Sequence, residues 1–268
     1  MEKEIGWLLQ EKYPHYQKFG VRASIGKLPK AAKKDIERLK AGEPLEHLIG
    51  FVEFLDCKIL ANKDALIPRA ETEYWVGEVV EKIYPKFKSF QNTDIKVLDM
   101  FAGSGCIGIS IAVSLRSLGE GGCGIHTTFA DSEKAALRQI EKNCVLNKIS
   151  KNRYKIIQSD VFLNIEGTFD YIFANPPYIP TTRKDKIQES VLKYEPHAAL
   201  FGGKDGLFFI RKFLAPAKNF LTENGQIFME FDSIQKKQIE AMLKKYGYTS
   251  WEFHKDQYGK WRWVIVDN

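Results

Sequence analysis

Between residues 95 and 231, short apolar runs alternate with stretches whose apolar residues recur at helical spacing. The runs are rich in β-branched and aromatic residues and predict strands at 95–100, 127–131, 155–159, 171–174 and 226–231. The remaining pattern predicts helices at 71–84, 107–115, 132–146 and 206–220. Apolar strands separated by helices form a mainly parallel sheet that helices cover on both faces. The sequence therefore predicts an α/β fold.

The C-terminal end of the chain departs from this alternation. A predicted helix at 233–246 is followed by predicted strands at 250–254 and 261–266, which a short turn at Tyr258 and Gly259 joins. A crossover between parallel strands needs a dozen or more residues, so these two strands must run antiparallel to each other.

Two smaller units are expected ahead of the α/β region. Residues 1–48 carry apolar residues at helical spacing, and Gly42 and Pro44 end that pattern. Residues 51–67 predict two short strands, interrupted at residues 62–64, which is typical of a hairpin. The predicted domains are a helical domain at 1–48, a hairpin linker at 49–70 and the α/β domain at 71–268.

Composition narrows the setting in which the protein works. No run approaches the roughly 18 apolar residues of a membrane span, and the charged N-terminus lacks the pattern of a signal peptide. A cytoplasmic protein without membrane contact is expected. The four cysteines form no CxxC pair, so no metal site is expected. The net charge of +6 is compatible with ribosome association, but a solvated helix face explains the lysines better.

A glycine-containing loop follows the first strand of the α/β region. Its residues are Phe101, Ala102, Gly103, Ser104 and Gly105. Glycine in such a loop lets the backbone approach a ligand closely. The pattern D-x-F-x-G-x-G has a phenylalanine where a dinucleotide fingerprint has its first glycine, which favours a nucleoside without a pyrophosphate.

Acidic residues end the next two strands. Asp131 ends the second strand, where a carboxylate can accept hydrogen bonds from both ribose hydroxyls of a nucleoside. Asp160 and Val161 end the third strand and are expected beside the adenine. The alternative for Asp131 is a cap on the following helix, and the alternative for Asp160 is a local turn.

The fourth strand ends in Asn175, Pro176, Pro177 and Tyr178, at the sheet edge where open α/β sheets place ligands. Two prolines fix the backbone and leave its carbonyls free as acceptors. If the Asn175 side-chain oxygen and the Pro176 carbonyl accept the two hydrogens of a planar –NH₂ group, its nitrogen faces a methyl sulfonium. Tyr178 can pack over the substrate plane. The plainer interpretation, a rigid turn, is disfavoured by the glycine loop and acidic strand ends that precede it.

The Asn-Pro-Pro-Tyr segment resembles the catalytic motif of amino-methyltransferases that act on adenine or on glutamine amides. Residues 66–73, LIPRAETE, are similar to the L-I-P-R-x-E-T-E block of the release-factor glutamine methyltransferases, the HemK/PrmC family. The resemblance runs from about residue 44 to the C-terminus. Further matching positions are Pro44, Gly50, Phe54, Glu195, Pro196, residues 199–207, Glu230, Gln235, Lys255, Asp256, Gly259 and Arg262.

This resemblance implies a Rossmann-like class I methyltransferase with a seven-stranded, mostly parallel sheet whose C-terminal strand is antiparallel. It implies methylation of N5 of the glutamine in the Gly-Gly-Gln loop of a peptide chain release factor, which the N-terminal helical domain helps to bind. The implied catalytic residues are Asn175, Pro176, Pro177 and Tyr178. The implied cofactor is S-adenosyl-L-methionine, held by residues 101–105, Asp131, Asp160, Val161 and Asn175.

Three positions depart from the family pattern. Phe101 and Phe231 stand where glycine is usual, and Val161 stands where an aromatic residue is common. The Phe101 form is similar to that of many nucleic-acid methyltransferases, so adenine N6 methylation of DNA or RNA stays an alternative. Glutamine methylation of a ribosomal protein and a catalytically silent binding module are the others. Arg69 and Glu71 are expected at the border of the cleft, without an assigned role.

Overall fold

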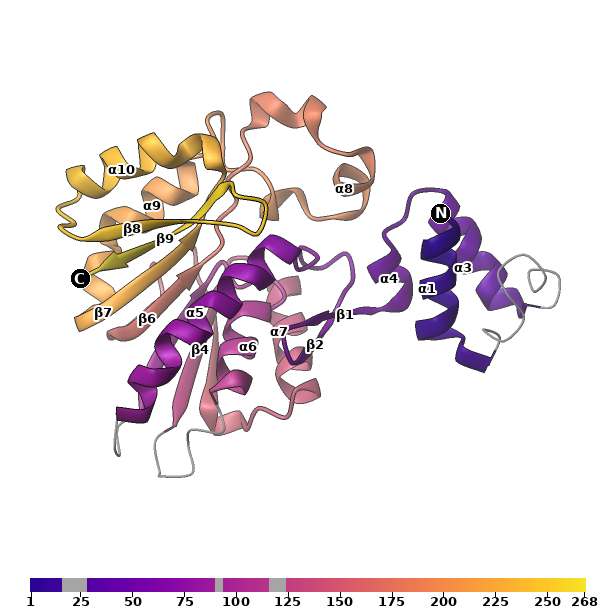
Figure 1. Ribbon diagram of the computed structural model, residues 1–268, viewed down its shortest axis with the longest axis horizontal. Helices are drawn as coiled ribbons and strands as arrows, with labels where there is room; N and C mark the ends of the chain where they lie inside the picture. The colour runs from indigo at the N-terminus through magenta and orange to yellow at the C-terminus, as the bar shows by residue number, and fades with distance from the viewer. Residues whose placement is uncertain (16–27, 90–93, 116–123) are drawn as a thin grey trace.

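The computed structural model describes residues 1–15, 28–89, 94–115 and 124–268. A small helical lobe at the N-terminus stands apart from a larger α/β body, and a two-stranded hairpin connects the two (Figure 1). The lobe buries its own apolar side chains in a separate cluster that includes Leu8, Ile36 and Leu48. Two of its helices follow the predicted pattern, α1 (Glu2–Lys12) and α3 (Lys30–Lys40), and a third, α4 (Leu45–Ile49), begins after Pro44, where that pattern was predicted to have ended. Residues 16–27 of this region lie outside the described part.

The hairpin turns earlier than the sequence predicted. Its strands are β1 (Phe51–Phe54) and β2 (Cys57–Leu60). Leu55 and Asp56 form the turn, so the predicted interruption at residues 62–64 is wrong. Leu55 adopts a positive φ of 49°, a conformation that leucine does not favour on its own. Its N–H donates to Glu73 Oε1 at 2.8 Å. Residues 62–64 instead form a local turn after β2, in which Asp64 N donates to Asn62 Oδ1.

A seven-stranded sheet forms the body, in the order β5-β4-β3-β6-β7-β9-β8. The strands β3 to β7 run parallel to one another, and β9 runs antiparallel to both of its neighbours. The mostly parallel sheet with an antiparallel C-terminal strand is thus confirmed. The strands are β3 (Ile95–Met100), β4 (Ile125–Asp131), β5 (Tyr154–Gln158), β6 (Phe169–Ala174), β7 (Leu221–Glu230), β8 (Trp251–Lys255) and β9 (Trp261–Asp267).

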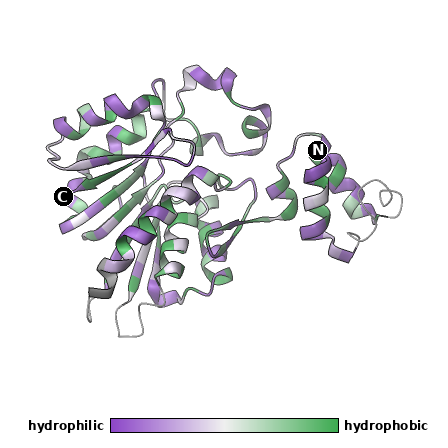
Figure 2. Cartoon of the chain, viewed as in Figure 1, coloured by the Kyte–Doolittle hydropathy of each residue, from purple (hydrophilic) through white to green (hydrophobic). Residues whose placement is uncertain are grey.

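Helices cover both faces of this sheet, and each face has its own hydrophobic core. Phe173 of β6 shares one core with Trp75 of α5, while the adjacent Ile172 shares the other with Phe213 of α9. Neighbouring residues of a strand face opposite sides, so β6 contributes to both cores. Figure 2 shows the middle strands largely in the hydrophobic colour and the outer helices alternating between the two colours. The first core includes α5 (Ala70–Ser89), α6 (Cys106–Ser114) and α7 (Lys134–Leu146), and the second α9 (Phe208–Ala217) and α10 (Lys236–Lys245).

The segment between β6 and α9 contains short helices that the sequence pattern did not predict. They are a 3-10 helix at Thr181–Lys186, α8 (Glu189–Tyr194) and a 3-10 helix at His197–Ala199. Helices of one or two turns are too short for hydrophobic periodicity to reveal. Among the described residues, a further 3-10 helix at Lys151–Arg153 precedes β5, and two more, at Lys218–Phe220 and Ser233–Gln235, lie inside the predicted helices at 206–220 and 233–246.

We expect Gly108→Ala to lower the free energy of unfolding by about 1–3 kcal/mol, because α6 packs closely on β4 at this residue. An added Cβ would lie 2.5 Å from Phe129 Cε1 and 2.9 Å from Thr127 Cγ2, and both side chains are buried. Gly77 in α5 is the matched control, since its added Cβ would meet Leu55 Cδ2 at an ordinary 3.5 Å. Gly77→Ala should stabilise the protein by about 0.5–1 kcal/mol. Urea unfolding compares the two variants, and equal changes would contradict this account.

Two kinds of feature are absent from the described ranges. No helix within them combines the length and the apolar character needed to cross a bilayer. Nor do three or more His, Cys, Asp or Glu side chains gather there in a way that could hold a metal ion.

Candidate active site

A pocket opens at the carboxyl edge of the parallel strands, where β3, β4, β5 and β6 end. It encloses about 970 Å³ of space, counting its open mouth. Open α/β sheets hold their ligands at this edge. Residues 64–69, Thr72 of α5 and Phe209 of α9 also line the pocket. Gly105, Pro176 and Tyr178 lie outside the lining. The other residues predicted for the site all line it: Phe101, Ala102, Gly103, Ser104, Asp131, Asp160, Val161, Asn175 and Pro177.

The loop after β3 has a left-handed backbone at three of its residues. The φ angles of Phe101, Gly103 and Gly105 are 59°, 54° and 78°. Glycine adopts this conformation without steric penalty, whereas a side chain costs about 1–2 kcal/mol. The Phe101 ring packs edge-on against Phe209 and Phe213, with centroid distances of 5.9 and 6.1 Å. These aromatic contacts offset the backbone strain, which explains how phenylalanine occupies a position where glycine is usual.

Asp131, the last residue of β4, holds the glycine loop and lines the pocket. Its Oδ2 accepts a hydrogen bond from Gly103 N at 2.8 Å, and its Oδ1 accepts one from Glu133 N at 2.9 Å. The second bond closes a local turn ahead of α7, whose N-cap is Glu133 and which has no side-chain cap, so the helix-capping alternative for Asp131 is wrong. Burial raises the pKa of Asp131 in spite of both bonds. Each carboxylate oxygen keeps acceptor capacity for a ligand in the pocket.

The turn after β5 forms the neighbouring wall. Val161 is buried and has a positive φ of 56°, and its carbonyl accepts a hydrogen bond from Ser159 Oγ. Ser159 Oγ also accepts from Asn164 N at 3.0 Å. The exposed carboxylate of Asp160 pairs with Lys212 Nζ of α9 at 2.5 Å. The turn therefore presents an apolar side chain to the pocket and fixes Asp160 at its rim.

The Asn-Pro-Pro-Tyr loop is fixed through its backbone. Gln235 is buried, and its Nε2 donates to the carbonyl oxygens of Tyr178 at 2.9 Å and Gly206 at 3.1 Å. Gly202 N donates to the Ile179 carbonyl at 2.9 Å. The half-buried Asn175 side chain lines the pocket. Backbone atoms of this loop are thus held by two distant segments of the chain.

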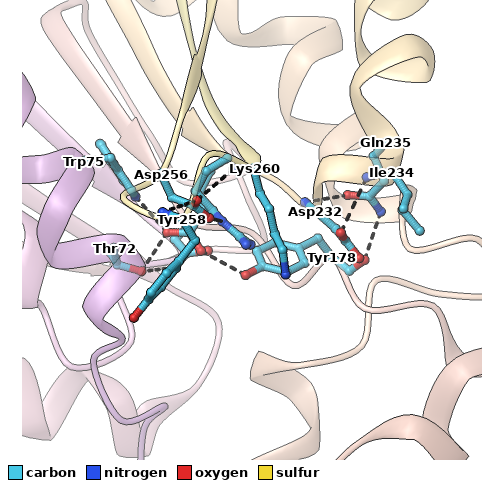
Figure 3. Close-up of polar contacts among 12 residues, drawn as sticks. Thr72, Trp75, Tyr178, Asp232, Ile234, Gln235, Asp256, Tyr258 and Lys260 are labelled. Carbon is cyan, nitrogen blue, oxygen red and sulfur yellow. Dashed lines mark hydrogen bonds and ion pairs between the residues drawn. The ribbon is translucent and has the colours of Figure 1, made fainter.

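A buried carboxylate beneath this loop received no role from the sequence. Glu230 ends β7, and its Oε2 accepts from Thr72 Oγ1 at 2.6 Å and from Trp75 Nε1 at 2.7 Å. Its Oε1 accepts from the Tyr178 hydroxyl at 2.9 Å. Figure 3 shows Thr72, Trp75 and Tyr178 converging from the helix and the loop. Two sequence features could have indicated this cluster: Glu230 ends an apolar strand, and Thr72 lies on the apolar stripe of α5.

Burial and neighbouring charges shift the pKa values of Tyr178 and Glu230 in this cluster. Burial is the main cause that raises the pKa of Tyr178 well above its usual value, and the neighbouring Glu230 raises it further. The phenol therefore stays protonated and donates a hydrogen bond to Glu230. Burial also raises the pKa of Glu230, while the hydrogen bonds from Thr72, Trp75 and Tyr178 and the charge of Arg262 oppose that shift. Arg262 is itself paired with the buried Asp256, with Nε 3.1 Å from Oδ2.

Arg69 ties together two segments of the pocket wall. Its Nη2 lies 2.6 Å from Oε1 of Glu195, whose side chain is only 1% exposed. The other oxygen of Glu195 accepts a hydrogen bond from Ile67 N at 3.1 Å. Residues 64–69 line the pocket from one of these segments, and Pro196, Ala198 and Ala199 line it from the other. The ion pair between Arg69 and Glu195 therefore holds two segments of the pocket wall together, which a solvated surface pair would not do.

Asp99 of β3 is a buried acid behind the glycine loop. Its Oδ2 accepts from Gly108 N at 2.8 Å, while Oδ1 has no hydrogen-bond partner among the described residues. Burial raises the pKa of Asp99 to about 8, with a further contribution from the charge of Asp131 and an opposing one from the Gly108 bond. With a pKa of about 8, the Asp99 side chain is mainly protonated at pH 7.

We expect Asp99→Asn to gain stability relative to the unchanged protein as the pH rises from 5 to 8. Between the unfolded pKa of about 4 and the folded pKa of about 8, the folded protein binds one more proton than the unfolded chain. Its free energy of unfolding therefore falls by about 1.4 kcal/mol per pH unit from this group, and asparagine removes that slope. Urea unfolding of both proteins at several pH values measures the difference. Parallel curves between pH 5 and 8 would contradict a neutral Asp99.

Comparisons with known proteins bear on both the fold and the family. A family model described as methyltransferase small domain matches residues 86–204. Among solved structures, the N-terminal domain of human METTL16 aligns with a TM-score of 0.58 at 15% identity, covering 99% of this chain and 93% of that one. A T. thermophilus 16S rRNA methyltransferase in complex with AdoMet and guanosine aligns with a TM-score of 0.55 at 16% identity, covering 81% and 49%. At such identities the likeness bears on the fold alone.

Curated relatives are more similar in sequence. The release factor glutamine methyltransferase of Flavobacterium psychrophilum is 35% identical over 237 residues, which cover 86% of this chain and 77% of the relative. The protein of the same name from Lactococcus lactis is 34% identical over 231 residues, which cover 86% and 79%. The chain therefore belongs to the release factor glutamine methyltransferase family.

Proposed function

We propose that this chain transfers a methyl group from S-adenosyl-L-methionine to N5 of the glutamine in the Gly-Gly-Gln motif of peptide chain release factors. The observation that carries this proposal is a single pocket in which the glycine loop and Asp131 share a wall with Asn175 and Pro177. Family membership supports glutamine as the acceptor and the release factor as the partner.

The residues around the pocket fit the proposed cofactor. The space over Gly103 is open, since an added Cβ would approach only Phe101 O, at 3.9 Å. Residues 101–105 and Asp131 would hold the nucleoside, with the Asp131 carboxylate accepting from the ribose hydroxyls. Asp160 and Val161 would border the adenine. The bound cofactor supplies an electrophilic methyl group on a sulfonium.

Asn175 and its neighbours would position the acceptor nitrogen. The lone pair of an amide nitrogen is delocalised into its carbonyl, so the nitrogen is a weak nucleophile. Acceptors at Asn175 Oδ1 and the Pro176 carbonyl would bind its two hydrogens and stabilise the positive charge that develops on nitrogen. Tyr178 would pack beside the amide, with its hydroxyl held by Glu230.

We also propose that residues 1–48 bind the release factor and that residues 49–70 link this lobe to the methyltransferase domain at 71–268. The lobe has its own core and projects from the body (Figure 1), and residues 64–69 of the linker reach the pocket wall. A factor held by the lobe could therefore place its loop over the pocket. The cytoplasm, with or without the ribosome, is the setting that this substrate requires.

The direct test is to incubate the purified protein with S-adenosyl-L-methionine and its host's release factor, and to locate any added methyl group by peptide mass spectrometry. The matched control substrate has alanine in place of the Gly-Gly-Gln glutamine. We expect one methyl group on that glutamine and none on the control factor. Methylation that persists in the control, or that appears only on a ribosomal protein or on adenine, would contradict the proposed substrate.

A further inference from the structure

The hydrogen bonds to Glu230 have a defined direction. Trp75 Nε1 can only donate, so Glu230 Oε2 must accept at that bond. The distance of 2.6 Å from Thr72 Oγ1 to Oε2 lies within the range of hydroxyl bonds to an ionised carboxylate. Burial raises the pKa of Glu230, but its three hydrogen bonds and the charge of Arg262 oppose that shift, and the short bond from Thr72 fits the ionised form. Thr72 therefore gives its single hydroxyl proton to Glu230.

A hydroxyl whose proton is committed can only accept further hydrogen bonds. Asn175 Nδ2 lies 3.4 Å from Thr72 Oγ1 and donates to it. The reversed amide would place Asn175 Oδ1 against the lone pairs of Thr72, which is unfavourable. Although the bond is long, its direction therefore decides which end of the amide faces Thr72. The other end, Oδ1, is left as the acceptor on the pocket side.

We propose that Thr72 is a positioning residue that, through its bond to Glu230, fixes the orientation of the Asn175 amide so that Oδ1 faces the substrate. The inference rests on the proposed function, because Oδ1 is useful only to a substrate that brings N–H groups. It also gives a reason for asparagine at residue 175, since an aspartate carboxylate would present only acceptors to the Thr72 oxygen. The positioning residues come from α5 and β7, far from the loop in sequence.

Thr72→Val removes the hydroxyl and keeps the shape of the side chain, while Thr72→Ser keeps the hydroxyl. We expect Thr72→Val to lower kcat for release-factor methylation about tenfold, because one orienting hydrogen bond is lost. The KM for the release factor should change less than about threefold. Thr72→Ser should restore kcat to within about threefold of the unchanged protein. Thr72→Ala gives the same comparison where valine disturbs folding, which thermal melting reveals. Equal kcat for the serine and valine variants would overturn the inference.

A double-mutant cycle separates positioning from a general structural effect. If Thr72 acts only through Asn175, Thr72→Val should have no further effect on kcat in an Asn175→Ala background. Thr72→Val that lowers kcat about tenfold in both backgrounds would show that it acts independently of Asn175, and the inference would fail.

A spectroscopic measurement tests the same point without turnover. With ¹⁵N-labelled asparagine, the side-chain resonance of Asn175 is assigned by its loss in Asn175→Ala. We expect its amide protons to exchange with water faster in Thr72→Val than in Thr72→Ser, and equal rates would refute the orienting bond. Faster exchange together with no methylation of any release factor by the unchanged protein would instead refute the proposed function and leave the positioning role standing.

Discussion

Asn175→Ala should lower kcat for release-factor methylation by about 10²–10³-fold, the effect of removing one preorganised polar group aimed at developing charge. Asn175 contributes the side-chain acceptor on the pocket wall and would bind one of the two hydrogens of the substrate amide. Without the Asn175 side chain, the substrate nitrogen is no longer held toward the methyl group, and its developing positive charge is no longer stabilised. The affinity for S-adenosyl-L-methionine should change only a few-fold, because residues 101–105 and Asp131 remain. Initial rates and titration calorimetry measure the two quantities.

Asn147→Ala is the matched control for this variant. Asn147 uses its side chain to bind both backbone groups of Lys58 in the hairpin, and it lies outside the pocket lining. Its loss should leave kcat near that of the unchanged protein. An Asn175→Ala protein with undiminished kcat would remove the residue from the mechanism.

The parts of the site that were predictable are those whose chemistry lies in contiguous residues. The loop at 101–105 and the segment at 175–178 each follow an apolar strand, and parallel strands bring their carboxyl ends to one edge. The alternation of strands and helices therefore places both loops at one edge, and the pairing of β3 with β6, which the sequence did not predict, brings them side by side. The same reasoning brings Asp131 to that edge, because it ends the adjacent strand.

The residues that were missed act through contacts between distant segments. Thr72 and Glu230 are 158 residues apart, and neither has a sequence neighbour that signals a hydrogen-bonded cluster. Thr72 and Glu230 are each a polar residue within an apolar pattern. Such a pattern indicates that the side chain is buried, but not which residue it is hydrogen-bonded to. The hairpin turn at Leu55 was missed for a different reason, because a bond from its backbone to Glu73 stabilises a conformation that leucine does not favour on its own.

Gly202→Ala should reduce kcat about a hundredfold, because the added Cβ would push directly against the catalytic loop. That Cβ would lie 2.4 Å from the Pro177 carbonyl oxygen and 2.6 Å from the carbonyl oxygen of Gly206. Both are backbone atoms, so no side-chain rotation relieves the collision. Buried Gln235 also ties the Gly206 carbonyl to the loop, so the segments are expected to shift together. A displacement of about 1 Å at the reacting groups is enough for a loss of this size.

Gly203→Ala is the control that separates displacement of the loop from loss of stability. Gly203 has a φ of +85°, and its added Cβ would come no closer than 3.1 Å, to Phe208 Cβ. The variant should therefore lose about 1–2 kcal/mol to backbone strain while keeping kcat near that of the unchanged protein. Thermal melting and initial rates of both variants give the comparison. If kcat falls equally in both, the catalytic effect comes from general destabilisation, and close packing of Gly202 on the Pro177 carbonyl is not what holds the loop in its active position.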